Sequence, residues 1–168
     1  MAKKTYIEKL NDIKDLPKIV DLNEKAQKKF NGKTMVVPKP TDIYDIMKNI
    51  PKGKLITTSE IRTLLSKKYN VDTACPLTTG IFVNISANAS IELNDDMPYW
   101  RTLKSNGEIN LKFPNAPEEQ IALLESEGFE IVTKGKKNIK YFVKDYENFL
   151  VFRYLRTDNK SLERNIWP

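Results

Sequence analysis

The chain has 168 residues and a formal net charge of +6, with 40% hydrophobic and 10% aromatic residues. This length predicts a single domain, and the apolar content is sufficient for a packed core, which excludes a disordered chain. The sequence contains one cysteine and no histidine. These counts exclude an internal disulfide, a multi-cysteine metal site and catalysis by Ser-His-Asp or Cys-His groups.

The positive charge is concentrated at the start of the chain. Residues 1–54 hold 13 lysines and 7 acids, whereas residues 55–113 hold 6 basic and 6 acidic groups and residues 114–168 hold 9 of each. A basic chain favours a polyanionic partner such as DNA, but the neutral middle region favours a protein partner. No apolar run approaches the roughly 20 residues of a membrane span, and no apolar segment of a signal peptide follows Met1. We therefore expect a soluble, cytoplasmic protein that makes no membrane contact.

Apolar spacing predicts several elements in the first third of the chain. Helices are expected at residues 6–14 and 17–30. An extended connector is expected at residues 35–40, because each proline disfavours helix at the residue before it. The next helix is expected from 41 to 49, and a turn at 51–53 should end it.

The middle of the chain has the pattern of a helix-turn-helix. A short strand at 55–56 precedes a helix expected at 60–69, whose N-cap is one of Thr57, Thr58 and Ser59. A turn at 70–72 leads to a second helix at 76–89, with Pro76 suited to its first turn. In this motif the second helix enters a groove of DNA.

The remainder of the chain predicts a loop at 90–96, a helix at 118–127 and a hairpin. The hairpin would pair residues 129–132 with residues 139–143 around a lysine-rich turn, and a winged-helix domain would place it beside the recognition helix. A last helix is expected from 146 to about 155, followed by a loosely held tail.

Three blocks of sequence resemble the O6-alkylguanine-DNA alkyltransferases. The segment from Met97 to Gly107, MPYWRTLKSNG, is similar to the family's active-site stretch, which reads Pro-Cys-His-Arg, an apolar pair and a Ser-x-Gly turn. The segment 50–61, IPKGKLITTSEI, resembles the entry to the family's helix-turn-helix. The segment 123–128, LLESEG, resembles the end of its last helix. The blocks occur in the family's order.

The resemblance implies a DNA-binding protein without the family's chemistry. Tyr99 stands in place of the alkyl-accepting Cys and Trp100 in place of the His. Alkyltransferase-like proteins with such replacements bind the lesion without repairing it. The resemblance therefore implies double-stranded DNA as the partner, no catalytic residue, no metal and no cofactor. It also implies a base pocket at Pro98, Tyr99, Trp100 and Arg101, although Tyr99 and Trp100 could equally fill that pocket as core residues.

Hydroxyl and lysine side chains are the candidates for contacts with DNA. Thr and Ser at two helix N-termini suit phosphate binding, although helix capping explains them as well. Lysines of the hairpin turn could follow the DNA backbone, although solubility explains them equally. The complete set of expected DNA-contacting residues is Thr57, Thr58, Ser59, Cys75, Pro76, Thr78, Thr79, Lys104, Ser105, Lys136 and Lys137.

The sequence also departs from the family. The stretch 75–80 lacks the Arg that replaces the extruded base in the stack, Thr58 stands where the nucleotide-rotating Tyr is expected, and 111–115 lacks the hydroxyls of the lesion loop. Two alternatives therefore stay open. One is alkyl transfer to Cys75, whose thiol precedes a helix and has no His to activate it. The other is a winged-helix module that binds a protein partner.

The predicted fold class is α+β: a winged helix-turn-helix domain of the alkyltransferase DNA-binding type with extra N-terminal helices and a C-terminal β-hairpin. The expected domains are a helical extension at 1–40, the winged-helix domain at 41–145 and a helix and tail at 146–168. We expect a monomer.

Overall fold

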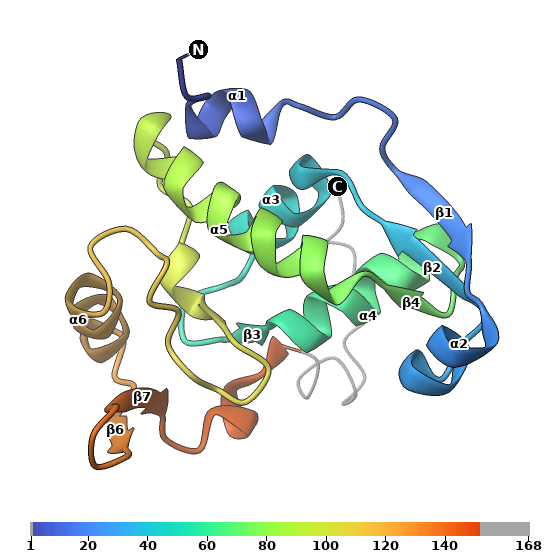
Figure 1. Cartoon of the computed structure of the whole chain (residues 1–168). Coiled ribbons are helices and arrows are strands. Elements are labelled where there is room, and N and C mark those ends of the chain that lie inside the picture. Colours follow the sequence, from blue (N-terminus) through green and yellow to red (C-terminus); the bar gives the residue numbers. More distant parts are fainter. Residues whose placement is uncertain (1, 152–168) are drawn as a thin grey trace.

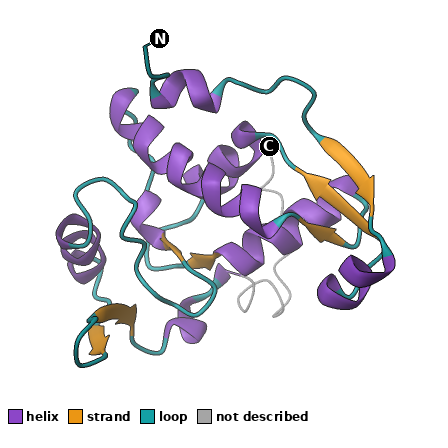
Figure 2. Cartoon of the chain, in the orientation of Figure 1, coloured by secondary structure: helices purple, strands orange, loops and turns teal. Residues whose placement is uncertain are grey.

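The computed structural model describes residues 2–151, in which helices α1, α3, α4 and α5 surround one apolar core (Figure 1). Of the three small sheets, two lie at the sides of the molecule, and the third, which has two short strands, is buried in its middle (Figure 2). The fold class is α+β, as predicted. The helices are α1 (Tyr6–Leu10), α2 (Glu24–Phe30), α3 (Pro40–Lys48), α4 (Thr58–Tyr69), α5 (Pro76–Glu92) and α6 (Glu118–Ser126), with 3-10 turns η1 (Tyr99–Arg101) and η2 (Tyr146–Phe149). The strands are β1 (Lys18–Asp21), β2 (Thr34–Val37), β3 (Ile56–Thr57), β4 (Thr73–Ala74), β5 (Thr102–Leu103), β6 (Ile131–Lys134) and β7 (Lys140–Val143).

The first 40 residues are less helical than the sequence suggested. The helix predicted at 17–30 is a strand, β1, followed by the shorter helix α2. The side chain of Asn23 caps α2 by accepting a hydrogen bond from the Ala26 N–H, so this helix begins at residue 24. The predicted connector at 35–40 contains β2, which pairs antiparallel with β1 and parallel with β4. Tertiary pairing therefore decided the structure of these short apolar segments.

Residues before 41 share the interior of the domain. Helix α1 ends at Leu10 rather than at residue 14, and Leu10 is buried in the main core. The carboxylate of Glu92, at the end of α5, accepts hydrogen bonds from the Tyr6 and Ile7 N–H groups at 3.1 and 2.9 Å. These contacts fasten the first helix to the C-terminal end of α5.

A second, smaller apolar cluster lies under α6 and the hairpin. Leu55, Leu103, Ile109, Leu124 and Phe129 are among its buried members. Strand β3 pairs parallel with β5, and β6 pairs antiparallel with β7. Leu55 also exchanges backbone hydrogen bonds with Phe149 and Val151. Phe149 and Leu150 pack against this cluster, whereas Val151 is buried in the main core. The predicted helix at 146–155 is a 3-10 turn at Tyr146–Phe149, and its part beyond 151 lies outside the described residues.

Other element boundaries shift by a few residues. Helix α5 runs to Glu92, three residues beyond its predicted end, and the hairpin strand β6 begins at Ile131 rather than at residue 129. Among residues 2–151, no helix combines the length and apolarity that crossing a bilayer requires.

Candidate nucleic-acid interface

Helices α4 and α5 form the predicted helix-turn-helix. Asn70 ends α4 in the left-handed conformation at φ 51°, and the Val71 N–H bonds back to the Ser66 carbonyl. Strand β4 follows, and the Cys75 N–H then donates to the Val36 carbonyl at 2.9 Å. The turn between the two helices is thus held by strand β2, so the start of α5 has a fixed position.

Hydroxyl side chains gather where α4 begins. The Thr58 and Ser59 hydroxyl oxygens lie 2.9 and 3.0 Å from that of Ser105, in the turn after the Met97–Arg101 segment. Ser59 and Ser105 are exposed. Thr57 is different: it is 3% exposed, and its side chain accepts a hydrogen bond from the Glu60 N–H as the helix cap. Thr57 is therefore a capping residue and not a phosphate contact, because its hydroxyl is buried.

The residues at the start of α5 that were predicted to contact DNA also differ in their exposure. Pro76 is exposed, and Cys75 and Thr78 are half-buried. Thr79 is fully buried, and its hydroxyl donates to the Cys75 carbonyl at 2.7 Å, so it cannot reach DNA from this position. Leu77, which the sequence analysis did not select, is 71% exposed.

The Met97–Arg101 segment forms a 3-10 turn whose first residues point inward. Pro98 is buried, and Tyr99 is 2% exposed. The Tyr99 ring makes edge-to-face contacts with Trp100 and Phe113, both at 5.6 Å between ring centroids. Its hydroxyl donates to Glu119 at 2.8 Å, and burial raises the pKa of this phenol. Tyr99 is therefore a core side chain in this structure, and it packs against Trp100 and Phe113 at the position where the resemblance places a base pocket.

Arg101 and Glu127 form a buried ion pair. We call this pair, together with the groups that hydrogen-bond to it, the Arg101–Glu127 cluster. Arg101 Nη2 lies 2.7 Å from Glu127 Oε1, and the two side chains are 13% and 6% exposed. The same carboxylate accepts from Trp100 Nε1 at 2.9 Å and from the Gly53 N–H at 3.2 Å. Arg101 Nη1 donates to the Ile50 carbonyl at 2.6 Å.

This cluster joins the three blocks that carry the family resemblance. Ile50 and Gly53 belong to the block at 50–61, Trp100 and Arg101 to the block at 97–107, and Glu127 to the block at 123–128. Burial by itself would raise the pKa of Glu127, but hydrogen bonds from Arg101 and Trp100 outweigh it and hold that pKa below its ordinary value. Three blocks that are distant in sequence therefore meet at one structural contact, and Arg101 serves the interior of the protein.

A polar network that the sequence analysis missed holds the loop after β5. The Gln120 side chain is fully buried, donates to the Trp100 and Thr102 carbonyls and accepts from the Asn110 N–H. Asn110 Nδ2 in turn donates to Asn84 of α5 at 2.7 Å. Amide side chains give no periodic or charge signal in a sequence, which is why these residues could not be selected from it.

Lys104 and the lysines of the hairpin turn lie in different environments. Lys104 Nζ lies 3.0 Å from the buried carboxylate of Glu108, so its charge is partly compensated. Lys136 and Lys137 are exposed in the hairpin turn. The hairpin pairs with the loop at Glu108 and Ile109 and lies near α6, well away from the start of α5 (Figure 1). The hairpin therefore does not flank the N-terminal half of α5, where the sequence analysis expected it.

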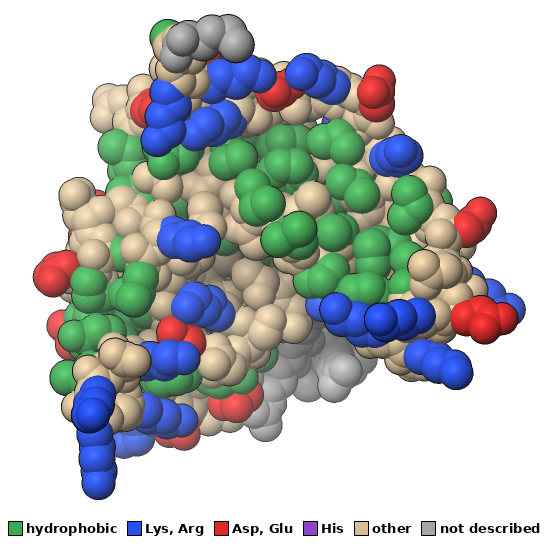
Figure 3. Space-filling model, viewed as in Figure 1, with side chains coloured by type: hydrophobic (Ala, Val, Ile, Leu, Met, Phe, Trp, Pro, Cys, Tyr) green, Lys and Arg blue, Asp and Glu red, His purple; other side chains and the backbone are tan. Residues whose placement is uncertain are grey.

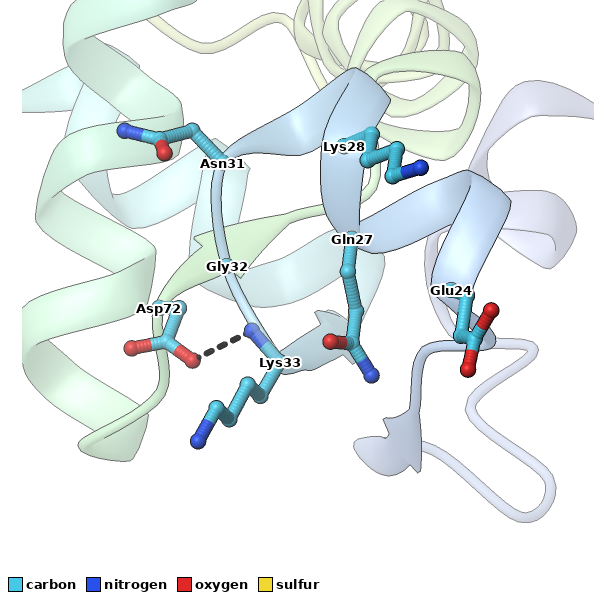
Figure 4. A pocket seen from close by; sticks show the side chains of 7 residues that line it. All are labelled: Glu24, Gln27, Lys28, Asn31, Gly32, Lys33 and Asp72. Atoms are coloured by element: carbon cyan, nitrogen blue, oxygen red, sulfur yellow. Dashed lines mark hydrogen bonds between the residues drawn. The ribbon is translucent and has the colours of Figure 1, made fainter.

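A polar groove of about 590 Å³ opens between α2 and the turn after α4 (Figure 4). Its lining residues are Glu24, Gln27, Lys28, Asn31, Gly32, Lys33 and Asp72. The Asp72 carboxylate accepts from the Lys33 and Thr34 N–H groups at 2.7 and 3.1 Å, and these bonds lower its pKa. None of the residues predicted to contact DNA lines this groove. Within residues 2–151, no group of three acidic or cysteine side chains could hold a metal ion.

No protein-family model matches this chain, and no curated protein sequence matches it. The chain is similar to the crystal structure of S. pombe Atl1 in complex with damaged DNA containing O6-carboxymethylguanine, with 22% identity, 66% of this chain and 92% of that chain covered, and a TM-score of 0.47. It is also similar to S. pombe ATL in complex with DNA, with 21% identity, the same coverage and a TM-score of 0.48.

Proposed function

We propose that this chain is a non-enzymatic DNA-binding protein of the alkyltransferase-like kind. It places α5 in a groove of duplex DNA and recognises a modified guanine at the Met97–Arg101 segment. The observation that carries this proposal is the hydroxyl cluster of Thr58, Ser59 and Ser105, which joins the first helix of the helix-turn-helix to the turn after that segment. The two parts of the chain that the resemblance assigns to DNA and to the base are thus adjacent.

The chemistry of the cluster suits a phosphate. Helix N-termini present unsatisfied N–H groups and a partial positive charge, and both attract anions. Ser59 and Ser105 are exposed beside the N-terminus of α4, and Lys104 adds a charge that is 42% exposed. Such contacts position a protein on the DNA backbone and carry no sequence information.

Several side chains support binding without alkyl transfer. The Tyr99 phenol is a weak nucleophile, because burial raises its pKa and its hydroxyl donates a hydrogen bond to Glu119. Trp100 cannot act as a general base, and its indole N–H is committed to Glu127. Cys75 is half-buried, and the whole chain contains no histidine that could activate it.

A second candidate is duplex binding with no preference for a modified base. The burial of Tyr99 between Trp100 and Phe113 favours it, because an extruded base would have to displace these rings. The two candidates share the helix-turn-helix and differ only in what the Met97–Arg101 segment does.

The deciding experiment measures binding to two matched duplexes, one of which carries a single O6-methylguanine, by fluorescence anisotropy at near-physiological salt. Tighter binding to the modified duplex would support the proposal. Equal binding with a steep salt dependence, with a log–log slope of roughly −0.9 per phosphate contact, would leave the second candidate. Absence of binding to both duplexes would contradict both candidates and redirect the search to a protein partner.

A further inference from the structure

The outer face of α5 has no positive charge that could bind a phosphate. We define this face by the exposed residues Pro76, Leu77, Ile81 and Ile91. No charged residue occurs in α5 before Glu92. Figure 3 shows apolar side chains gathered over α5, with basic and acidic side chains mixed around their margin. Because contacts between cations and phosphates supply a large share of the affinity for a duplex, the cation for this interface must come from another element.

Arg62, in helix α4, is a half-buried cation without a carboxylate partner. Among residues 2–151, no carboxylate forms an ion pair with it. Its Nε–H donates to the Ala74 carbonyl at 2.9 Å, and its Nη2 donates to the Thr73 hydroxyl at 3.0 Å. A guanidinium has five N–H donors, so three of them remain unused within this part of the chain. Burial lowers the pKa of Arg62, but an arginine keeps its proton at neutral pH.

Arg62 borders a small pocket of about 210 Å³ on one face of α4. The pocket is lined by Ser59, Arg62, Thr63, Ser66, Asp72 and Thr73. The first four share a face of the helix, because residues three and four positions apart are neighbours on its surface. The hydroxyls of Thr63 and Ser66 already donate to carbonyls of the same helix, at 3.1 and 2.9 Å. The unused donors of the pocket therefore belong to Arg62, and they call for a negatively charged acceptor.

The carboxylate in the lining of this pocket is engaged elsewhere. Asp72 accepts hydrogen bonds from the Lys33 and Thr34 N–H groups and from the Thr34 hydroxyl, and Figure 4 shows the bond from Lys33. These bonds fix the turn after α4 to the start of strand β2. Asp72 therefore serves the backbone of its own turn, and the guanidinium of Arg62 stays available to a ligand.

The position of Arg62 indicates which anion it binds. Ser59 belongs both to this pocket and to the hydroxyl cluster that we propose as a contact with the DNA backbone. The Ala74 carbonyl, to which Arg62 donates, comes directly before Cys75, the N-cap of α5. Arg62 therefore lies between the starts of the two helices of the helix-turn-helix. A DNA strand passes this region when the second helix of the motif enters a groove.

From these observations we infer that Arg62 binds a phosphate diester of the DNA backbone through its unused N–H groups, beside the hydroxyl cluster. This inference rests on the proposed DNA binding and adds the cation that the outer face of α5 lacks. The planar guanidinium can donate two parallel hydrogen bonds to the oxygens of one phosphate. Such a contact positions the duplex without reading its sequence, so it should strengthen binding to modified and unmodified duplexes equally.

The test compares the wild-type chain with Arg62→Gln, which removes the charge and keeps a polar side chain. Fluorescence anisotropy measures the affinity for an O6-methylguanine duplex and for its unmodified match over a series of salt concentrations. Arg62→Gln should weaken binding to both duplexes about tenfold. It should also reduce the log–log salt slope by about 0.9, the value of one lost phosphate contact. A side chain that only held the turn before α5 would not change the number of counterions released, so the slope would stay the same.

The matched control is Lys14→Gln, which removes one exposed positive charge after α1. Helix α1 is fastened to the far end of α5, so this variant should keep the wild-type slope. Circular dichroism reports whether each variant is folded. A second measurement needs no variant: phenylglyoxal modifies accessible arginines, and peptide mass spectrometry locates the adducts. Bound duplex should protect Arg62 from this reagent.

The outcomes separate this contact from DNA binding itself. If the wild-type chain binds the duplexes but folded Arg62→Gln keeps the wild-type slope, the phosphate contact is wrong while DNA binding stands. The same conclusion follows if bound duplex leaves Arg62 as reactive toward phenylglyoxal as it is in the free chain. If the wild-type chain binds neither duplex, the proposed function itself fails.

Discussion

The Arg101–Glu127 cluster and the outer face of α5 are opposite in almost every respect. The cluster unites three recognisable sequence blocks, buries its charges and satisfies its donors within the protein. The face of α5 contains no recognisable block, has no charge and leaves Leu77 largely exposed. The comparison shows that family-like residues such as Arg101 and Glu127 build the interior of this chain, whereas the outer face of α5 is formed by residues without a motif. Mutations in the two regions should therefore separate stability from binding.

The largest expected effect is that of Arg101→Ala on stability. The substitution leaves the Glu127 carboxylate buried without its counter-ion, which should lower the free energy of unfolding by about 3–5 kcal/mol. Urea unfolding followed by circular dichroism measures it. The control is Lys144→Ala, which breaks a pair with Glu130 in which the side chains are 51% and 67% exposed and should cost less than about 1 kcal/mol. Similar losses for the two variants would show that the cluster is no more important than a surface pair.

Tyr99 should behave as a core residue that also carries a hydrogen bond. Tyr99→Ala should cost about 3 kcal/mol or more, because it empties space between Trp100 and Phe113. Tyr99→Phe removes only the hydroxyl that donates to Glu119 and should cost about 1 kcal/mol. Thermal unfolding of both variants provides the measurement. If Tyr99→Ala were as stable as the wild type, the ring would not be part of the core, and a pocket at this position would gain support.

Acid should weaken the contact between α3 and the end of α5. Hydrogen bonds from Tyr44 and Lys48 lower the pKa of Asp95 to about 2 from an ordinary value of 3.8. Because the folded-state pKa is the lower one, the ionised carboxylate stabilises the fold above about pH 4, and this contribution is lost as the pH falls from about 4 to about 2.

The Asp95→Asn variant should lose about 1 kcal/mol of the pH-dependent free energy of unfolding, a value that allows for solvent screening of this partly exposed group. Urea midpoints measured at pH 2, 3, 4 and 6 for both proteins test the expectation. Parallel pH profiles would show that other carboxylates dominate the acid response.

The smallest expected effect is that of Cys75→Ser. The Cys75 side chain makes no capping hydrogen bond to α5, so duplex affinity should change by less than about twofold. Intact-protein mass spectrometry after incubation with O6-methylguanine DNA should show no added methyl group. A methylated wild-type chain and an unmodified Cys75→Ser chain would establish alkyl transfer and overturn the non-enzymatic proposal.

Local sequence signals determined much of the fold. The predicted helices at 41–49, 60–69, 76–89 and 118–127 correspond to α3, α4, α5 and α6, because each has a run of apolar residues bounded by a cap, a proline or a glycine. The lysine-rich hairpin was also predicted, with its first strand displaced by two residues. The substitution of Tyr99 and Trp100 for a reactive pair is likewise visible in the sequence.

Only the tertiary structure decided which of these residues point inward. The hydroxyls of Thr57 and Ser59 cannot be told apart by composition, yet Thr57 is buried as a cap while Ser59 is exposed, because helix position sets the direction of each side chain. Strand β1 and the inward turn of Tyr99 depend on partners outside their own segments, namely β2 and Phe113. The exposure of Leu77 follows from the same cause: one side of α5 is covered by α1, α3 and α4, and nothing in the local sequence states which side that is.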